Sequence, residues 1–503
     1  MSTELQNAQS AVETTTQNLD EFSQVLKQSF RPRNEDAARA VDSAISTLVN
    51  QALADSTLIK GDVLDTLDEM IAQIDRKLTE QMNEIIHAAE FQQIESAWRG
   101  LNYLVMNSET DATLKIKVMN ASKKELLDDL RLYPGARWDQ SPLFKKVYEQ
   151  EFGQLGGEPF GAIVADYYFS QAPLDVTLMR GLTKIAASAH APLLTGAHPN
   201  LLGMDSWTEL MNPRDLSKLF DTPDYAAWKS LRDAEDSRYL GLCMPRVLSR
   251  LPYGSKSDPV EEFAFEEDTD GHDGKNYGWM NAAYAMGVNV TRAFKEFGWC
   301  TRIRGVQSGG EVINLPVHTF PTDDGGIDLK CPTEIAITDR REAELSKSGL
   351  IPLIHRKNTD KAAFIGAQSV YLPKRKMDKA TGRTEEATAA DNLSARLPYI
   401  FAVSRFAHYL KCMVRDKVGS NLEKEQLERW LTNWLNLYID GDPANSSEST
   451  KASRPLADGR VEVTPNEENP GYYNARFFLR PHYQLEGMDI GMSLVSRLPA
   501  PKS

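Results

Sequence analysis

The stretch from Gly161 to Leu194 constrains the fold of this chain more than any other. The apolar run GAIVAD (161–166) is followed by helical periodicity over Val176–Ala189, and Ala191–Leu194 is a second apolar run. A strand, a helix and a second strand in this order favour a right-handed crossover, which makes the two strands parallel. The sequence therefore predicts a mixed α/β fold with a partly parallel sheet.

A different pattern precedes this body. Apolar residues three and four apart form one narrow seam along a predicted helix, at Leu64, Leu67, Ile71, Ile74, Leu78, Met82 and Ile85. Such a seam suits packing against another helix. Two interpretations stay open, an intrachain helical hairpin and a contact with a second protein chain. A further helix is predicted over Phe91–Val105, with Trp98 and Leu101 facing a core.

A short helical pattern interrupts the polar N-terminal leader. Asn18 can cap a helix, with Glu21 three positions on. Four apolar residues then fall on one face, at Leu19, Phe22, Val25 and Leu26. A short amphipathic helix in a flexible leader is suited to binding in a groove of another protein, and docking on the chain's own body explains the pattern equally well.

The remaining body gives a series of shorter predictions. Thr113–Val118 alternates as a strand, Tyr239–Met244 is an apolar strand, and Val312–Ile337 is rich in strand signals. The acidic, glycine-bearing stretch Ser255–Lys275 is typical of an exposed loop. Helices are predicted at Lys123–Leu132, Asn281–Phe297, Leu393–Val418 and Lys424–Leu437.

The chain ends in predicted strands at Arg460–Thr464, Ala475–Tyr483 and Met488–Arg497, and the last two can pair as a hairpin around Gln484–Gly487. A terminal hairpin has at least one open edge, which invites a strand from another chain. The alternative is an edge covered by the chain's own helices. The candidate inter-subunit strand residues are Phe477, Phe478, Leu479, Ile490, Met492 and Leu494.

Composition excludes several classes of protein. The net charge of −14 argues against a general nucleic-acid binder, which needs a basic face. No apolar run approaches the roughly 18 residues that a membrane helix needs, and the N-terminus lacks the pattern of a secretory signal. We therefore expect a cytoplasmic protein without membrane insertion. The four cysteines are far apart and lack CxxC spacing, which favours buried free thiols.

The sequence contains no recognisable catalytic apparatus. It has no GxxxxGK[ST] phosphate loop, no GxGxxG after a strand, no HExxH and no GxSxG elbow. We therefore predict no catalytic, cofactor-binding or metal-binding residues and no enzymatic activity. An α/β enzyme whose site is assembled from distant residues is the alternative from another class.

Five ordered blocks resemble the large sheath subunit of the type VI secretion system, the TssC or VipB family. Together they span most of the chain after the N-terminal helices, which makes the resemblance far more specific than a short motif. The blocks are FQQIESAWRGLNYLV (91–105), RYLGLCMPRVLSRLPYG (238–254), GWCTRIRGVQSGGEVINLPVHTF (298–320), AELSKSGLIPLIHRKNTDKAAFIGAQS (343–369) and GYYNARFFLRPHYQLEGMDIGMSLVSRLP (471–499).

The resemblance implies a contractile tail-sheath-like fold and a mechanical function. A protein of this family pairs with a small subunit (TssB or VipA) and polymerises into a helical tube on a baseplate, around an inner tube of Hcp. The sheath contracts and propels the tube with its effectors into a target cell, and the AAA+ unfoldase ClpV then recycles it. The sheath stands in the cytoplasm on a membrane-anchored baseplate. A sheath of another contractile injection system is the nearest rival.

The resemblance also suggests roles for particular regions. It implies a leader with the ClpV-binding helix at 1–35, a helical partner-binding region at 36–105, a sheath body at 106–400 and a completing region of helices and a hairpin at 401–503. The seam residues Leu64, Leu67, Ile71, Ile74 and Leu78 are candidates for binding the small subunit. Arg405, Lys411, Arg415 and Lys417 are candidates for the tube contact, with ordinary solvated faces as the alternative.

Overall fold

The computed structural model describes residues 63–212, 216–374, 391–421, 423–465 and 473–485, together with the single residues 39, 43 and 47. The chain divides into two compact units. The first consists of Met1–Gln92 and Leu251–Tyr277, and the second of Gln93–Arg250 and Gly278–Ser503. The domain limits expected from the sequence, near 35, 105 and 400, stay predictions.

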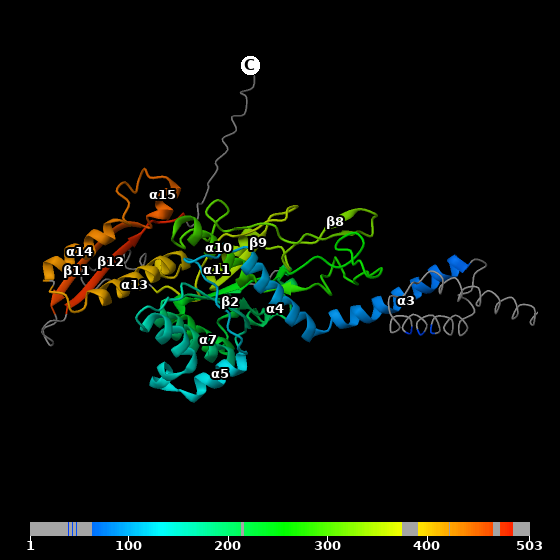
Figure 1. The fold of residues 1–503 in the computed structure, drawn as a ribbon, viewed down its shortest axis with the longest axis horizontal. Coiled ribbons are helices and arrows are strands. Elements are labelled where there is room, and N and C mark those ends of the chain that lie inside the picture. The colour runs from blue at the N-terminus through cyan, green and yellow to red at the C-terminus, as the bar shows by residue number, and fades with distance from the viewer. Residues whose placement is uncertain are drawn as a thin grey trace, which may run out of the picture. The chain divides into compact units, whose positions relative to one another are not determined.

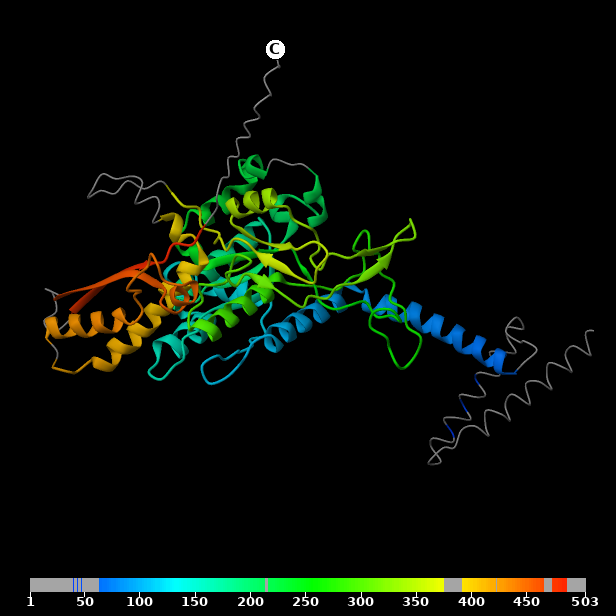
Figure 2. The same ribbon diagram turned by 90° about the horizontal axis from the view of Figure 1, so that it is seen from above.

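The described part of the first unit consists mainly of a helix and a loop. Helix α3 (Val63–Ile86) is one long continuous helix in Figure 2. The acidic segment 255–275 is a loop, as predicted, and it is fastened to the helix by Asn83. The Asn83 Nδ2 donates to the Glu266 carbonyl (3.2 Å), and its Oδ1 accepts from the Asp268 N–H (2.9 Å).

The second unit is built on a six-stranded mixed sheet. Its order is β1-β2-β3-β9-β10-β6, and the first four of these strands are parallel while β10 and β6 run antiparallel to their neighbours. The predicted strand–helix–strand crossover is therefore confirmed. The strands are β1 (Ile163–Phe169), β2 (Leu193–Ala197), β3 (Leu240–Met244), β9 (Leu350–His355), β10 (Ala362–Phe364) and β6 (Glu311–Val312).

Helices cover both faces of this sheet (Figure 1). Successive strand residues point to opposite faces, so Leu193 joins one core cluster and Leu194 the other. Helix α7 (Pro173–Ala189) contributes to the first cluster, and α10 (Ala282–Phe297) to the second. The strands need apolar side chains at consecutive positions because both faces are buried, and this is why they are visible in the sequence as apolar runs.

The predicted helices of the body are confirmed within a few residues. Helix α5 (Lys123–Leu132) begins after Ser122, whose hydroxyl accepts from the Glu125 N–H in a capping box. Other helices of three turns or more are α4 (Ala89–Met106), α13 (Leu397–Lys417) and α14 (Lys424–Asn436). No helix within the described residues combines the length and apolar character that spanning a bilayer requires.

The remaining elements are short. They are η2 (Gly135–Gln140), α6 (Pro142–Phe144), the π-helix η3 (Lys145–Gly153), η4 (Pro199–Leu202), η5 (Trp207–Met211), α8 (Leu216–Leu219), η6 (Pro223–Tyr225), α9 (Ala226–Arg232), η7 (Glu235–Tyr239), β4 (Val247–Leu248), β5 (Trp279–Met280), β7 (Thr319–Pro321), β8 (Ile327–Leu329), α11 (Asp339–Lys347) and α15 (Glu448–Ser453). The segment 312–337 thus has fewer and shorter strands than its sequence predicts.

Two sequence predictions are wrong or only partly right. The segment 113–118 forms no strand, and its lysines Lys115 and Lys117 pair with Glu158 and Glu151. Its alternation reflects side chains that point in and out without a backbone ladder. All four cysteines are free as predicted, but only Cys243 is buried, while the other three are half-buried.

Candidate assembly surfaces

The strands β11 (Leu456–Pro465) and β12 (Tyr473–Pro481) form a separate antiparallel sheet. In Figures 1 and 2 this sheet lies alongside α14, and the described residues cover only one of its faces. The core beneath it contains Val461 and Val463 with Phe477 and Leu479 packed against them. The sheet is therefore held to the body by one apolar face.

The opposite face of this small sheet is polar. The Arg460 guanidinium lies over the exposed Phe478 ring, 4.3 Å from its centroid, and Arg480 pairs with Asp458 at 3.8 Å. Of the predicted inter-subunit residues, Phe477 and Leu479 therefore face the core, whereas Phe478 faces outward. Ile490, Met492 and Leu494, and with them the predicted hairpin, lie outside the described residues.

The outer edge of β11 is partly occupied by the chain itself. The Val463 N–H donates to the Glu428 carboxylate (3.4 Å) and the Gly459 N–H to the Asp458 carboxylate (2.9 Å). At the start of the strand, Leu456 forms a parallel bridge with Ile439. Side chains and a neighbouring segment thus take the positions that an added strand needs.

The outer edge of β12 is open. Residues directly opposite in an antiparallel ladder point their backbone groups either toward each other or both away. Because the Val463 N–H points away from β12, its partner Ala475 points its own N–H away from β11, and the alternation extends this to Phe477 and Leu479. Within the part of the chain that the structure describes, no strand pairs with this edge.

The chain beyond β12 is fixed to the body by Gln484. Its side-chain oxygen accepts from Arg304 Nε (2.8 Å), and its side-chain nitrogen donates to the Thr301 carbonyl (2.9 Å). Its backbone N–H donates to the Tyr399 hydroxyl (3.0 Å). These bonds fix the end of the small sheet and so keep the open edge in a defined position.

The predicted seam lies along α3. Ile71 is 47% exposed and Leu78 is 41% exposed, while Ile74 is half-buried. Leu64 and Leu67 belong to the same helix, but the structure does not describe their side chains. The leader residues Leu19, Phe22, Val25 and Leu26 lie outside the described part of the chain. The seam thus presents several large apolar side chains at the surface.

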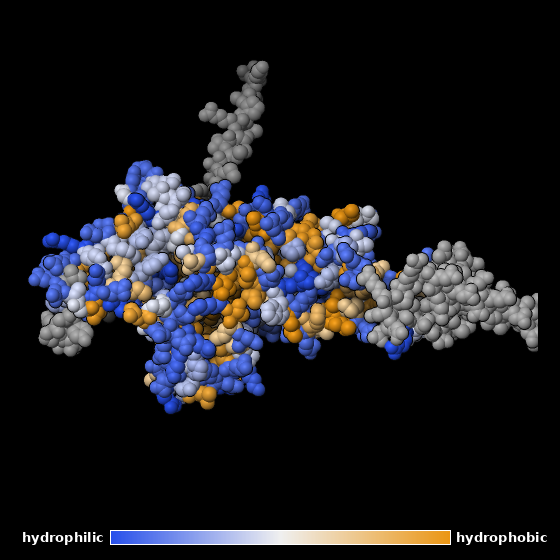
Figure 3. Space-filling model, in the orientation of Figure 1, coloured by the Kyte–Doolittle hydropathy of each residue, from blue (hydrophilic) through white to orange (hydrophobic). Residues whose placement is uncertain are grey.

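The part of α4 in the second unit has two unlike faces. Leu104 packs against Tyr284 and Val288 of α10, and Leu101 is half-buried beside them. On another face, Ile94 is 61% exposed and Trp98 is 68% exposed. The prediction that Trp98 faces a core is therefore wrong. Apolar side chains of this kind interrupt the polar surface in Figure 3.

Charged side chains fix α4 to the segment that follows β4. Glu95 accepts from Arg250 Nε at 2.7 Å and from Arg99 Nε at 2.8 Å. Burial raises the pKa of the Glu95 carboxyl, but these two guanidinium groups outweigh burial and lower the pKa below its usual value. The carboxylate is therefore ionised at neutral pH, and it holds the helix by charge-assisted hydrogen bonds.

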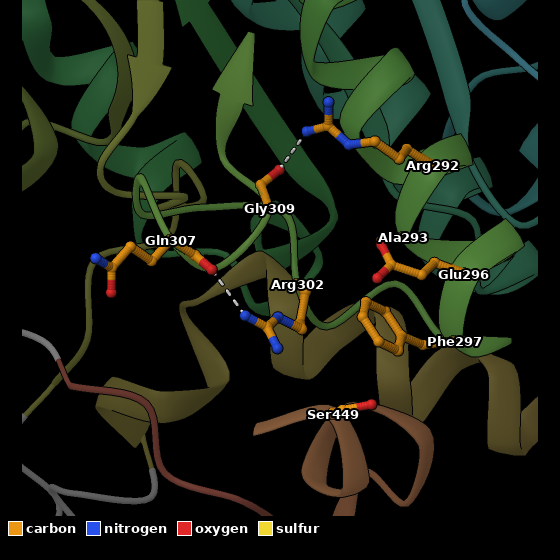
Figure 4. A pocket seen from close by; sticks show the side chains of 8 residues that line it. All are labelled: Arg292, Ala293, Glu296, Phe297, Arg302, Gln307, Gly309 and Ser449. Carbon is orange, nitrogen blue, oxygen red and sulfur yellow. Dashed lines mark hydrogen bonds between the residues drawn. The ribbon is translucent and has the colours of Figure 1, made fainter. Parts of the chain in front are cut away.

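A cavity of about 200 Å³ lies between the end of α10, the loop before β6 and α15 (Figure 4). Its two guanidinium groups already bind the chain. Arg292 Nη2 donates to the Gly309 and Glu311 carbonyls (2.9 and 2.8 Å), and Arg302 Nη2 donates to the Gln307 carbonyl (2.8 Å). These bonds order the glycine-rich loop, so the cavity has a structural explanation.

The basic side chains of α13 also bind the chain itself. Lys411 lies over the Phe152 ring at 3.6 Å, and Arg415 donates to the carbonyls of Phe152 and Gln154 at 2.9 and 2.8 Å. Arg405 lies over Tyr409, and Lys417 over Trp430. Among the described residues, no group of three or more His, Cys, Asp and Glu is placed to hold a metal ion.

Comparison with known proteins identifies the family. Residues 68–371 match the VipB family, described as EvpB/VC_A0108, tail sheath N-terminal domain. Residues 386–498 match its second domain, described as EvpB/VC_A0108, tail sheath gpW/gp25-like domain. The type VI secretion system sheath protein TssC1 of Pseudomonas aeruginosa (strain PAO1) is 59% identical over 490 residues, which cover 97% of each chain.

Two solved structures from the anti-feeding prophage are more distant. A chain of its baseplate is 10% identical, with a TM-score of 0.35 over 64% of this chain and 66% of that one. A chain of its contracted helical sheath is 11% identical, with a TM-score of 0.26 over 63% of this chain and 74% of that one. The two family matches and the relative aligned almost end to end show that the chain belongs to the VipB family of type VI secretion sheath proteins.

Proposed function

We propose that this chain, as the large sheath subunit, pairs with a small subunit of the TssB/VipA type and polymerises around an Hcp inner tube. The observation that carries this proposal is the edge of β12, which is open within the described residues, on a sheet that has two strands there. Contraction changes the packing of subunits without breaking a covalent bond, so the chain needs no catalytic site. The polymer stands in the cytoplasm on a membrane-anchored baseplate.

Strand addition at this edge suits a sheath that changes its packing. An incoming strand hydrogen-bonds to the backbone of Ala475, Phe477 and Leu479, while the side chains of Phe477 and Leu479 stay packed against the core. The contact therefore depends little on side-chain fit across the interface. Neighbouring bodies can rotate while the backbone bonds continue to tether them. An open edge is otherwise a liability that proteins cover or charge.

The substitution Ala475→Pro tests strand addition. Proline removes an N–H that points outward, and edge strands tolerate proline at such positions, so the β11–β12 ladder is kept. The variant is co-expressed with the small-subunit candidate and examined by negative-stain microscopy. Wild type and the control Ala475→Val, which keeps the N–H, form long tubes, and Ala475→Pro forms none while its melting temperature is nearly unchanged.

Tubes from Ala475→Pro in wild-type amounts contradict pairing at the β12 edge. Globular particles from the wild-type pair contradict the sheath proposal itself and favour the enzyme alternative.

The exposed apolar side chains of α3 support a contact with the small subunit. Ile71 and Leu78 lie on one side of the helix, two turns apart, and leaving both in water is unfavourable. The double variant Ile71→Asp/Leu78→Asp is expected to abolish co-purification of the tagged pair. Leu155→Asp, at a position 74% exposed in the second unit, is the control and leaves the pair intact. A folded double variant that retains its partner shows that the seam packs within the chain.

We propose that the helix predicted from the sequence of the leader is the site for the ClpV unfoldase. Leu19, Phe22, Val25 and Leu26 supply the apolar face that a groove of the unfoldase binds. In the double variant Phe22→Asp/Leu26→Asp, sheaths assemble and contract as in wild type but lose ClpV binding in a pelleting assay. Unchanged binding contradicts this assignment.

A further inference from the structure

The six-stranded sheet ends on one side in β1, and within the part of the chain that the structure describes no strand pairs with the outer edge of β1. The opposite edge belongs to β6, which has only two residues, and its Glu311 carbonyl already accepts from Arg292 (2.8 Å). β1 has seven residues, of which all but the last are half-buried, whereas every residue of β2 and β3 is buried. The long edge of this sheet is therefore the one without a neighbour.

The backbone groups of β1 point alternately toward β2 and away from it. In a parallel ladder the N–H and the carbonyl of one residue point to one side, and those of the next residue point to the other. The Ile163 N–H donates to the Pro192 carbonyl, just before β2 (2.9 Å). At the other end of the strand, the Phe169 carbonyl accepts from the His198 N–H, just after β2 (2.9 Å). At both ends of β1 the odd-numbered residues therefore point toward β2.

The even-numbered residues Val164, Asp166 and Tyr168 direct their backbone groups outward. The ladder is irregular between Val164 and Tyr168, but the same alternation holds on both sides of the irregularity. The Tyr168 carbonyl agrees with it, since this carbonyl accepts from Nζ of Lys123 in α5 (2.9 Å). Ile116 and Val164 pack against the same small core cluster, yet no backbone hydrogen bond joins residues 113–118 to β1. The outward groups of Val164 and Asp166 are thus available to an extended chain.

Apolar side chains flank this edge on both faces of the sheet. On one face, Leu101 and Ile116 are half-buried against the cluster that α10 forms with α4. On the other face, Ala121 and Leu127 are half-buried against the cluster that contains α7, and the Ala121 carbonyl accepts from the Tyr167 hydroxyl of β1. A strand beside β1 therefore meets apolar surface on both of its faces. Such a strand needs a continuous apolar run, as β2 and β3 have, and not an alternating pattern.

We propose that the outer edge of β1 binds a strand of the small subunit. This contact rests on the proposed pairing with that subunit and is separate from strand addition at β12. The strand is a continuous apolar run of about six residues, which matches the length of β1. Its backbone hydrogen-bonds to Val164 and Asp166 and extends the six-stranded sheet by one strand.

A second copy of this chain supplies no suitable strand among the described residues. The edge that it leaves open belongs to β12, where Arg476 and Arg480 interrupt any apolar run. The two open edges of the chain thus select different sequences. The edge of β12 accepts an alternating strand, whereas the edge of β1 requires one that is apolar on both faces. This difference is the reason to assign the strand at β1 to another protein.

Hydrogen exchange of the full-length chain, alone and in complex with the co-expressed small-subunit candidate, tests the proposal. Residue-resolved mass spectrometry follows the amides of β1. In the chain alone, the N–H groups of Val164 and Asp166 are expected to exchange at least about tenfold faster than that of Ile163, which bonds to Pro192. In the complex the two outward amides slow at least about tenfold, and a run of consecutive apolar residues in the small subunit becomes protected with them.

Two variants of one residue assign the effect to the backbone. Val164→Pro removes an outward N–H, which edge strands tolerate, and is expected to lower co-purification of the small subunit at least about tenfold. Val164→Ala keeps the N–H and loses comparable packing, and it retains the partner. Should Val164→Pro unfold the chain, its melting curve shows this, and the exchange of the wild-type protein then decides.

The inference is overturned if the wild-type complex forms and Val164 and Asp166 exchange as fast as in the chain alone. It is equally overturned if these amides slow with rising concentration of this chain in the absence of the small subunit, because a second copy then occupies the edge. Failure of the wild-type pair to form any complex contradicts the proposed function itself and, with it, this inference.

Discussion

The central sheet and the β11–β12 sheet differ in how much of their surface the chain buries. Every residue of β2 and β3 is buried, because helices cover both faces of the six-stranded sheet. In β12 the residues from Tyr473 to Arg476 are exposed and those from Phe477 to Pro481 alternate between half-buried and exposed, and its outer edge lacks a partner within the described residues. The first arrangement holds the body together, and the second leaves backbone and surface available. Under the proposal that β12 pairs with a strand of another subunit, stability and assembly depend on different parts of one unit.

The largest difference in the free energy of unfolding is expected between alanine substitutions of two phenylalanines, one in each sheet. Phe364 of β10 is fully buried, whereas Phe477 of β12 is half-buried against the core cluster that contains Val461 and Val463. Phe364→Ala is expected to cost about 3–5 kcal/mol of the free energy of unfolding, and Phe477→Ala roughly 1–2 kcal/mol. Urea denaturation of the purified chain measures both. Equal losses show that the small sheet is as much a part of the stable core as the central one.

Acid is expected to weaken the helix that joins the two sheets. Helix α13 contributes Phe401 to the core of the central sheet and Phe406 to the core of the small one. Beyond Phe406 along the same helix, buried His408 donates from Nε2 to the Ala189 carbonyl at 2.8 Å. Burial, together with nearby Arg405, His190 and Lys411, lowers the pKa of His408 to about 4.

Because this pKa is lowered on folding, the unfolded chain binds the proton more readily than the folded chain does. The stability is therefore complete above the unfolded pKa of about 6.5 and falls as the pH drops toward 4, by about 3 kcal/mol in total. Urea denaturation at pH 7.5 and pH 5 measures the slope. His408→Gln keeps a donor for the Ala189 carbonyl and is expected to reduce the change of the free energy of unfolding with pH. Part of that change remains, because the pKa of His190 is also lowered on folding. An unchanged slope contradicts the assignment to His408.

The sequence predicts the parts of the fold that follow from local pattern or two-sided burial. Helix α5 was predicted with its observed limits, Lys123–Leu132, and β1, β2 and β3 were visible as apolar runs. The sequence could not predict which backbone N–H groups of β12 face outward. That follows from the hydrogen bond between the Val463 N–H and the carboxylate of Glu428, which belongs to α14.

Helix α4 provides the last comparison, between two residues of one turn. Trp98 is 68% exposed, whereas a Cβ added at Gly100 meets the Tyr284 ring at 2.4 Å. Gly100→Ala is therefore expected to destabilise the chain by about 1–3 kcal/mol, because the ring must move within a packed core. Trp98→Ser changes the free energy of unfolding by less than about 0.5 kcal/mol, since it removes almost no internal contact.

The same two variants separate stability from assembly. An exposed tryptophan is a typical anchor of protein interfaces, so Trp98→Ser is expected to reduce co-purification of the small subunit at least about tenfold. Gly100→Ala retains the partner below its melting temperature, because the exposed face of α4 is unchanged. If Trp98→Ser retains the partner fully, the small subunit binds elsewhere on the chain. In that case the exposed face of α4, like the outer face of the β11–β12 sheet, is surface that assembly does not require.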